Sequence, residues 1–528
     1  GGAATISTTY AASGLVSGTT NVGGLLGLDG GTVTSSFWDI STTGQALSAG
    51  GVGAVGITTT ALAMTQSSYA GWDFTNTWWM SNTDTRPFLR SEHSTTITNA
   101  HQLQLMGMDA TTLSAAYKMA NNIDLASELA AGGMWNVTKG FVPIGNITTN
   151  FTGNFDGQNN TISNLTINRG SRSGMFGYIG VGGAVSNVGL LSGTVSGGGS
   201  VGMLAGVNNG TISNSYVNIG TVSGNLFGIG GLVGDNTGDI INSYVIGGTV
   251  SATTYGTVGG LVGSNSGNIV NSYVTGGVVS ATSTSGSRVG GLAGFNSGAI
   301  SGSYVDGGTV VTSTSGSVGG LVGFNDFSGS VTNSFVNGGS VSGSGSSIGG
   351  LVGRNSGSIS ISYASGGTVN GGSKDSGGLV GANAGGTIDG SYAIGVGVSG
   401  TGTDVGGLVG NNSTTGSINN SYVSGGSAVG PSISVGGLVG DNRGLIASSY
   451  VTGGTVVSGL RYAGGLVGYS HSNVEAIISD SYVLSAAVTA TGSYVGGLGG
   501  LVTGVHTNSH YDIDAVTLNG SNAVSVGG

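Results

Sequence analysis

The chain of 528 residues has no cysteine, three prolines and few charged residues. The absence of cysteine excludes disulfides, thiol catalysis and zinc sites built on cysteine. Lys and Arg number 11 against 21 Asp and Glu, and they form no run. We therefore expect no nucleic-acid partner, because phosphate binding needs clustered cations. With so little proline, and no glycine at every third position, the 113 glycines do not indicate collagen.

Long apolar runs are also missing. No stretch of 18 apolar residues occurs, so we expect no transmembrane segment in this chain. Hydrophobic residues nevertheless make up 38% of the sequence and the mean hydropathy is +0.25, which leaves apolar surface to bury. The chain starts at Gly1 in mid-pattern and without a signal peptide, as we expect of a fragment or a processed product. The composition predicts a glycine-punctuated, β-rich array or several domains.

A Gly-Leu-Val-Gly box recurs through the second half of the chain. Its leucine stands at Leu232, Leu261, Leu292, Leu321, Leu351, Leu379, Leu408, Leu438 and Leu466, with weaker copies at Met175, Leu204 and Leu498. Ten intervals over 294 residues, from Leu204 to Leu498, give a period of 29.4 residues. About twelve residues after each leucine comes Ser-Tyr-Val or a variant, and Gly-Gly-Thr-Val or similar follows directly. A repeat this regular predicts a stacked array.

Each repeat is expected to form three short strands separated by glycine turns, with Val, Ile, Tyr and Leu facing inward. One repeat has too little apolar surface to fold alone, but stacked copies bury a continuous column. The predicted fold class is all-β, a parallel β-helix or β-solenoid. Its coils of about 29 residues would stack about 4.8 Å apart, next to a small helix-containing cap.

One polar column and one aromatic column accompany the leucines. Four residues after nine successive anchors stands asparagine, at Asn208, Asn236, Asn265, Asn296, Asn325, Asn355, Asn383, Asn412 and Asn442. These amides either hydrogen-bond along the axis or simply tolerate a left-handed turn. The aromatic column runs through Tyr216, Tyr244, Tyr273, Tyr304, Phe335, Tyr363, Tyr392, Tyr422, Tyr450 and Tyr482. We favour stacked rings inside or at a corner of the solenoid over a binding stripe.

The chain divides into four parts. Residues 1–92 hold four of the five tryptophans and are predicted to be the end of a first array with a Trp-rich closing segment. Residues 93–170 are predicted to cap a second array, which occupies 171–505 and is followed by an exit segment, 506–528. A cap of this kind covers an otherwise open sheet edge.

Within the cap, Asn99 is expected to begin a helix over Ala100–Met108, with Leu103 and Met106 on its apolar side. Tyr117–Leu125 is predicted to be one strand. Phe151–Ile167 is predicted to form two strands around a turn at Asp156-Gly157.

The Gly-Leu-Val-Gly boxes resemble GLUG repeats of large bacterial exoproteins similar to filamentous haemagglutinin. The resemblance extends over nearly the whole chain. It includes an opener formed by Ile97–Leu105, Ala120–Leu125, Phe151–Gly157 and Thr161–Leu165, and a close formed by Phe37–Gln45 and Gly71–Phe74. His510–Gly520 departs from the usual close and is similar to the exit sequence of two-partner secreted adhesins. The resemblance implies a β-solenoid, export and surface display, and it supplies no catalytic residue.

Candidate chemistry is sparse. Asp235 and Asp441 share an outward position three residues after an anchor but lie seven coils apart, and Asp306, Asp389 and Asp480 fall elsewhere. These acids are interpreted as solvated turn residues rather than a catalytic pair. His506 and His510, followed by Asp512, would lie about 13 Å apart along a strand, too far for a metal site. The glycine boxes lack the helix and the Lys-Ser/Thr of a nucleotide loop. We predict no catalytic, cofactor-binding or metal-binding residue.

Two surface features remain. Phe295 and Phe324 occupy the same outward phase on adjacent coils and are expected to form an exposed aromatic pair. Asn-x-Ser/Thr sequons stand at Asn136, Asn146, Asn150, Asn159, Asn164, Asn209, Asn411, Asn412, Asn419 and Asn519, where modification is an open alternative.

The leading hypothesis is a non-enzymatic, extracellular adhesive or structural rod of a large secreted bacterial surface protein, with an unidentified glycan or protein ligand. The first alternative is a subunit that self-associates head to tail into an extracellular filament or sheath. The second is the non-catalytic repeat region of a secreted peptidase or a polysaccharide-active β-helix protein, because GLUG repeats also accompany some secreted zinc peptidases.

Overall fold

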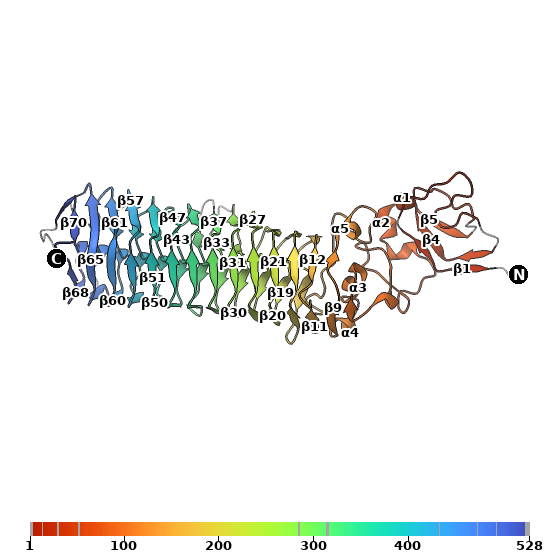
Figure 1. Cartoon of the computed structure of the whole chain (residues 1–528), viewed down its shortest axis with the longest axis horizontal. Coiled ribbons are helices and arrows are strands. Elements are labelled where there is room, and N and C mark those ends of the chain that lie inside the picture. The colour runs from red at the N-terminus through yellow and green to blue at the C-terminus, as the bar shows by residue number, and fades with distance from the viewer. Residues whose placement is uncertain are drawn as a thin grey trace.

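The computed structural model describes residues 4–12, 14–28, 31–50, 53–282, 286–312, 316–431, 433–472, 474–492 and 494–522. Its strands stack into a long rod, with a more irregular N-terminal part at one end (Figure 1). Four long sheets run the length of the rod, with 12, 15, 26 and 11 strands. Their strand pairings are parallel, apart from β70 (Val516–Leu518) with β71 (Ser521–Asn522). The predicted parallel β-solenoid is confirmed.

One coil contains five short strands, not the expected three. In a representative coil these are β24 (Val233–Asn236), β25 (Asp239–Ile241), β26 (Tyr244–Ile246), β27 (Thr249–Ala252) and β28 (Thr257–Gly259). β24 lies in the 12-stranded sheet, β25 in the 15-stranded sheet, β26 and β27 in the 26-stranded sheet, and β28 in the 11-stranded sheet. Two glycines with positive φ, Gly247 and Gly248, separate β26 from β27. The Ser-Tyr-Val and Gly-Gly-Thr-Val motifs therefore form two strands of one sheet.

The Gly-Gly-Leu-Val-Gly box forms a corner where two strands contact each other through their backbones. A Cβ at Gly259 would lie 2.0 Å from the Val262 carbonyl oxygen, and one at Gly260 would lie 2.1 Å from that of Gly291. A Cβ at Gly263 would lie 2.3 Å from the backbone nitrogen of Ile229 in the preceding coil. Leu261 between them is fully buried. Three glycines are thus required for close approach, while the leucine fills the core.

The asparagine column is an axial ladder. Each Asn from Asn208 to Asn412 donates from Nδ2 to the Oδ1 of the next, over 2.7–2.9 Å. All nine side chains are buried, and none of the nine residues has a positive φ. The left-handed turns are occupied by other asparagines, such as Asn242 and Asn271. Of the two explanations left open by the sequence, the hydrogen-bonded ladder is the correct one.

The aromatic column consists of stacked rings as predicted, but it lies outside the core, and the prediction that its tyrosines face inward is wrong. In strands such as β26 the central valine is buried, while the tyrosine before it is partly exposed. Successive rings from Tyr216 to Tyr482 stack with centroids 4.7–5.0 Å apart and planes within 13°. Neighbouring rings cover each other's faces, so the column presents ring edges to solvent.

The cap contains three short helices, α3 (Ala100–Leu105), α4 (Ala110–Leu113) and α5 (Ala126–Leu129). Asn99 caps α3 as predicted, accepting a hydrogen bond from the Gln102 backbone N–H at 2.9 Å. Leu103 and Met106 are fully buried, but the helix ends at Leu105, three residues earlier than expected.

The strands of the cap are shorter and more numerous than expected. Tyr117–Leu125 is not one strand, because a turn separates β9 (Ala116–Met119) from β10 (Ile123–Asp124). Phe151–Ile167 contains β11 (Asn154–Asp156) and β12 (Thr161–Ser163), and β13 (Thr166–Asn168) begins within it. β11 and β12 belong to different sheets, so the chain turns a corner of the coil there and forms no hairpin.

Residues before the cap include a partial coil. β1 (Thr5–Ser7) pairs in parallel with β3 (Thr32–Thr34), and β2 (Tyr10–Ala11) pairs with β4 (Ser36–Asp39). β4 also pairs with β5 (Ala54–Ile57), and α1 (Ile40–Thr43) and α2 (Thr60–Ala63) follow these strands. Two short 3-10 helices, at Gln66–Ser68 and Arg90–Glu92, flank the hairpin of β6 (Trp78–Trp79) and β7 (Phe88–Leu89).

A fully buried arginine attaches this N-terminal module to the cap. Arg86 and Asp39 are both fully buried and bonded to each other, and Arg86 also donates to the Gly133 carbonyl oxygen of the cap. In the part of the chain that the structure describes, no helix is long and apolar enough to cross a membrane.

Candidate functional site

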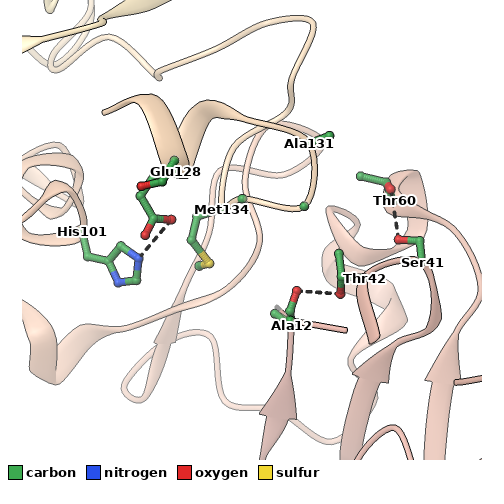
Figure 2. A pocket seen from close by; sticks show the side chains of 12 residues that line it. Ala12, Ser41, Thr42, Thr60, His101, Glu128, Ala131 and Met134 are labelled. Atoms are coloured by element: carbon green, nitrogen blue, oxygen red, sulfur yellow. Dashed lines mark hydrogen bonds and ion pairs between the residues drawn. The ribbon is translucent and has the colours of Figure 1, made fainter. Parts of the chain in front are cut away.

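A cavity of about 630 Å³ lies between the N-terminal module and the cap. Ser41, Thr42 and Thr60 line one wall, and His101 and Glu128 line the other (Figure 2). His101 Nδ1 lies 2.7 Å from Glu92 Oε2, and this hydrogen bond raises the pKa of His101. Its Nε2 lies 3.8 Å from Glu128. The histidine is thus held between two carboxylates and is not bonded to a hydroxyl nucleophile.

The hydroxyl groups of this cavity are also committed. Ser41 Oγ donates to Asp39 Oδ1 and lies 3.3 Å from Thr60 Oγ1, and Thr42 Oγ1 donates to the Ala12 carbonyl oxygen. A serine nucleophile needs a base within hydrogen-bond reach, whereas His101 occupies the opposite wall (Figure 2). Among its described lining residues, the cavity therefore offers polar groups for a small ligand but no nucleophile and base in contact.

A second candidate is the corner between the 11-stranded and 12-stranded sheets. Two outward side chains seven residues apart in each coil meet there. Thr257 Oγ1 lies 2.8 Å from Ser264 Oγ, and the rings of Tyr462 and Tyr469 stack with centroids 5.1 Å apart. Outward side chains of adjoining strands can contact each other in this way only where the corner is concave.

We call this surface the variable corner, because its residues change from coil to coil. In the 11-stranded sheet its column is Thr257, Arg288, Ser317, Ser347, Asp375, Asp404, Ser434, Tyr462 and Tyr494. In the 12-stranded sheet it is Asp235, Ser264, Phe295, Phe324, Arg354, Ala382, Asn411, Asp441, Tyr469 and Leu501. The Leu, Asn and Tyr columns of the same coils hardly vary.

The predicted aromatic pair lies in this corner. Phe295 of β34 (Ala293–Asn296) and Phe324 of β39 (Val322–Asn325) are neighbours in register, with centroids 5.7 Å apart in an edge-to-face arrangement. Both are half-buried rather than fully exposed, since a guanidinium covers them. The carbon at the centre of the Arg288 guanidinium lies 4.8 Å from the Phe295 centroid and 5.0 Å from that of Phe324.

Acidic residues gather further along the same corner. Asp375 of β48 (Asp375–Gly377) and Asp404 of β53 (Asp404–Gly406) are partners in register on adjacent coils. Burial, and next the charge of Asp404, raise the pKa of Asp375 to about 7. Burial, and next the charge of Asp441, raise the pKa of Asp404 to about 6. Like charges this close favour sharing a proton over double ionisation.

Asp235 and Asp441 are not the solvated turn residues that the sequence suggested. They lie in strands, Asp235 in β24 and Asp441 in β59 (Val439–Asn442). The Asp441 side chain is 5% exposed, 3.1 Å from Arg443 Nη2 and 2.8 Å from His471 Nε2. Burial raises the pKa of Asp235, which accepts a hydrogen bond from Ser200. The concave corner buries them, and this curvature is not visible in the sequence.

The other acids and the histidines bring no catalytic group together. Asp306, Asp389 and Asp480 accept hydrogen bonds from Asn337, Asn420 and Asn508 of the following coils. His506 and His510 do not share a strand as expected, because a turn separates β68 (Val505–Thr507) from β69 (His510–Tyr511). Among the described residues, no three His, Cys, Asp or Glu side chains are placed to hold a metal ion.

Part of the chain is similar to a known protein. No family model matches the chain, so the resemblance to GLUG repeats stays a prediction. A segment of halomucin from Haloquadratum walsbyi (strain DSM 16790 / HBSQ001) is 38% identical over 128 residues. The match covers 23% of this chain and 1% of halomucin, so the chain spans a very small part of that protein.

One solved structure is also similar. It is the crystal structure of a "putative immunoglobulin A1 protease" from Bacteroides ovatus, 19% identical, with a TM-score of 0.21. The match covers 62% of this chain and 74% of that one. At this TM-score the likeness adds nothing to the fold described above.

Proposed function

We propose that the chain is a non-enzymatic, extracellular rod of a large bacterial surface protein, and that its variable corner binds the ligand. The observation that carries this proposal is the contrast between columns. Leu, Asn and Tyr recur because each packs against its own copy in the next coil. The variable corner instead holds arginine, phenylalanine, aspartate and tyrosine, the residue types that bind ligands, in an order that does not repeat.

The rod itself supports an adhesive role. Parallel strands bonded along the whole axis, with a continuous core and an internal amide ladder, make a stiff support that holds a surface away from a cell. Halomucin contains a related segment that is only 1% of its length, as we expect if such arrays serve as lengths of rod within long chains. The resemblance to exported adhesins points the same way.

A glycan array tests the proposal. The full chain is labelled and applied to neutral, amino and acidic oligosaccharides, beside a variant carrying Phe295→Ser and Phe324→Ser, the residue found at Ser264 in the same column. Phe327→Ser is the matched control, because Phe327 is 80% exposed and lies in a turn outside the corner.

We expect the parent and the Phe327 variant to bind a common set of glycans and the double variant to lose them. Equal binding by all three chains would contradict a role of the corner. Cleavage of a bound glycan, detected as new reducing ends, would contradict a non-enzymatic function.

A further inference from the structure

We propose that Arg288, Phe295, Phe324 and Arg354 form a binding site for the carboxylates of an acidic polysaccharide. The inference rests on the proposed function, in which the variable corner is the binding surface, and it names the ligand class. These four residues are called the Arg-Phe patch below.

The patch is built across three coils. Arg288 lies in β33 (Ser287–Gly290) and is in register with Ser317 of the next coil. Phe324 is in register with Phe295 on one side and with Arg354 of β44 (Val352–Asn355) on the other. Both guanidinium groups lie against the Phe324 ring, with their carbons 5.0 and 5.7 Å from its centroid. The two cations therefore lie within about 11 Å of each other, along the axis of the rod.

Neither guanidinium has an ion pair with a carboxylate in the part of the chain that the structure describes. The register neighbours of Arg288 are Thr257 and Ser317, and those of Arg354 are Phe324 and Ala382. An aromatic ring against the flat face of a guanidinium leaves its N–H edge available. That edge matches the two oxygens of a carboxylate in a bidentate hydrogen bond.

The spacing and surroundings favour a polymer with few charges over one with many. Two arginines, two coils apart, would meet acidic groups about 10 Å apart, at twice the strand spacing. Between them the half-buried phenyl rings of Phe295 and Phe324 offer apolar surface to the C–H faces of sugars. Asp235 and Asp375 lie in the same corner on either side of the patch, and the chain carries a net charge of −10. A nucleic acid, with a charge every few ångströms, would be repelled there.

The test is calorimetric titration of the full chain with polygalacturonate oligomers. The same oligomers with methyl-esterified carboxyls serve as the neutral ligand. The variants are Arg354→Gln, Arg354→Lys and Arg288→Gln, and the control is Lys118→Gln, which removes one exposed cation from β9 in the cap. Melting midpoints verify that each variant is folded. Because the Arg354 side chain is exposed, we expect both Arg354 variants to fold like the parent.

We expect the parent to bind the free acid and not the ester. Each Arg→Gln change should weaken binding about tenfold or more, because a charged bidentate hydrogen bond is lost. Arg354→Lys should restore little, since lysine lacks the planar fork. Lys118→Gln should leave the affinity unchanged.

Equal binding of acid and ester, or equal losses in the Lys118 and Arg354 variants, would overturn the carboxylate site. If the parent then still bound other glycans and lost them on Phe295→Ser with Phe324→Ser, the proposed function would stand without this inference. If the parent bound neither the acid in preference to the ester nor any other glycan through the two phenylalanines, the carboxylate site and the proposed function would both be rejected.

Discussion

Replacement of one rung of the asparagine ladder tests the physical account of the rod. Asn296 accepts from Asn265 Nδ2 at 2.8 Å, and it donates to Asn325 Oδ1 at 2.8 Å and to the Gly298 carbonyl oxygen at 3.1 Å. In Asn296→Ala one N–H of the Asn265 amide and the Oδ1 of Asn325 lose their partners inside the buried column, while the Gly298 carbonyl oxygen still accepts from the Ser330 N–H at 2.9 Å. Each unsatisfied buried group costs about 1–3 kcal/mol, so for two such groups we expect a local destabilisation of about 2–6 kcal/mol.

The assay is native-state hydrogen exchange measured by mass spectrometry, because long repeat arrays do not unfold in two states. Peptides covering β34 and β39 should lose protection, while the cap should not. The control is Asn337→Ala, which removes an exposed amide bonded to Asp306 in the same region. We expect this change to cost about 0.5 kcal/mol or less.

A double-mutant cycle separates the ladder from simple loss of volume. Asn296→Ala and Asn325→Ala both remove the bond between these two residues, so the double variant should be less destabilised than the sum of the single ones by about 1 kcal/mol. Strict additivity, or an effect of Asn296→Ala no larger than that of Asn337→Ala, would refute the ladder as a source of stability.

Three further predictions follow from burial and from the sheet edge. Since burial raises the pKa of Asp375 to about 7 and that of Asp404 to about 6, the stability linked to their protonated forms is complete below pH 4 and is lost as the pH rises through 6 and 7. Asp375→Asn should therefore raise the melting midpoint at pH 8 and not at pH 4, and equal midpoints at pH 8 would contradict the burial argument. Leu321→Asp should place a charge in the core, unfold neighbouring coils and admit proteolytic cleavage near residue 321, so resistance equal to the parent would be evidence against an inward leucine. The exposed outer strand β68 should support end-to-end association of the chain. Light scattering over a hundredfold concentration range would detect this association, and a particle that stays monomeric over that range would contradict it.

The main features of the fold could be predicted because each column interacts with copies of itself. A leucine or an asparagine at the same position of every coil recurs in the sequence with a regular period. The buried serines show the limit of this approach. From Ser215 to Ser449, the backbone N–H of each Ser before the aromatic column bonds the Oγ of the corresponding Ser in the next coil. The Ser-Tyr-Val motif includes these serines, but a polar side chain in a glycine-rich repeat does not indicate that it is buried.

Strand number and facing were harder to predict. Gly247 and Gly248 form one of the predicted glycine turns and separate β26 from β27. The three repeated motifs do not mark β25 and β28 as further strands of the coil. The alternating pattern predicts inward-facing tyrosines, yet the adjacent valine takes the inward position. Stacking against identical rings gives the tyrosine a partly buried environment without entering the core.

The variable corner could be predicted only in part, and the reason follows from how it is built. The sequence shows that the third residue after each anchor varies, and it indicates the pair Phe295 and Phe324. The residue that contacts this position lies seven residues earlier in the chain and in a different strand. Only the concave angle between the two sheets brings Arg288 over the two phenyl rings. A column whose side chains stack on their own copies is constrained to one residue type. In the variable corner the side chains of two columns contact each other, so a Thr and Ser pair can be replaced by Arg and Phe, or by two tyrosines, without disturbing the core. The freedom of this corner to vary therefore has a structural cause, and comparison of the coils within a single chain locates the surface that we propose to bind the ligand.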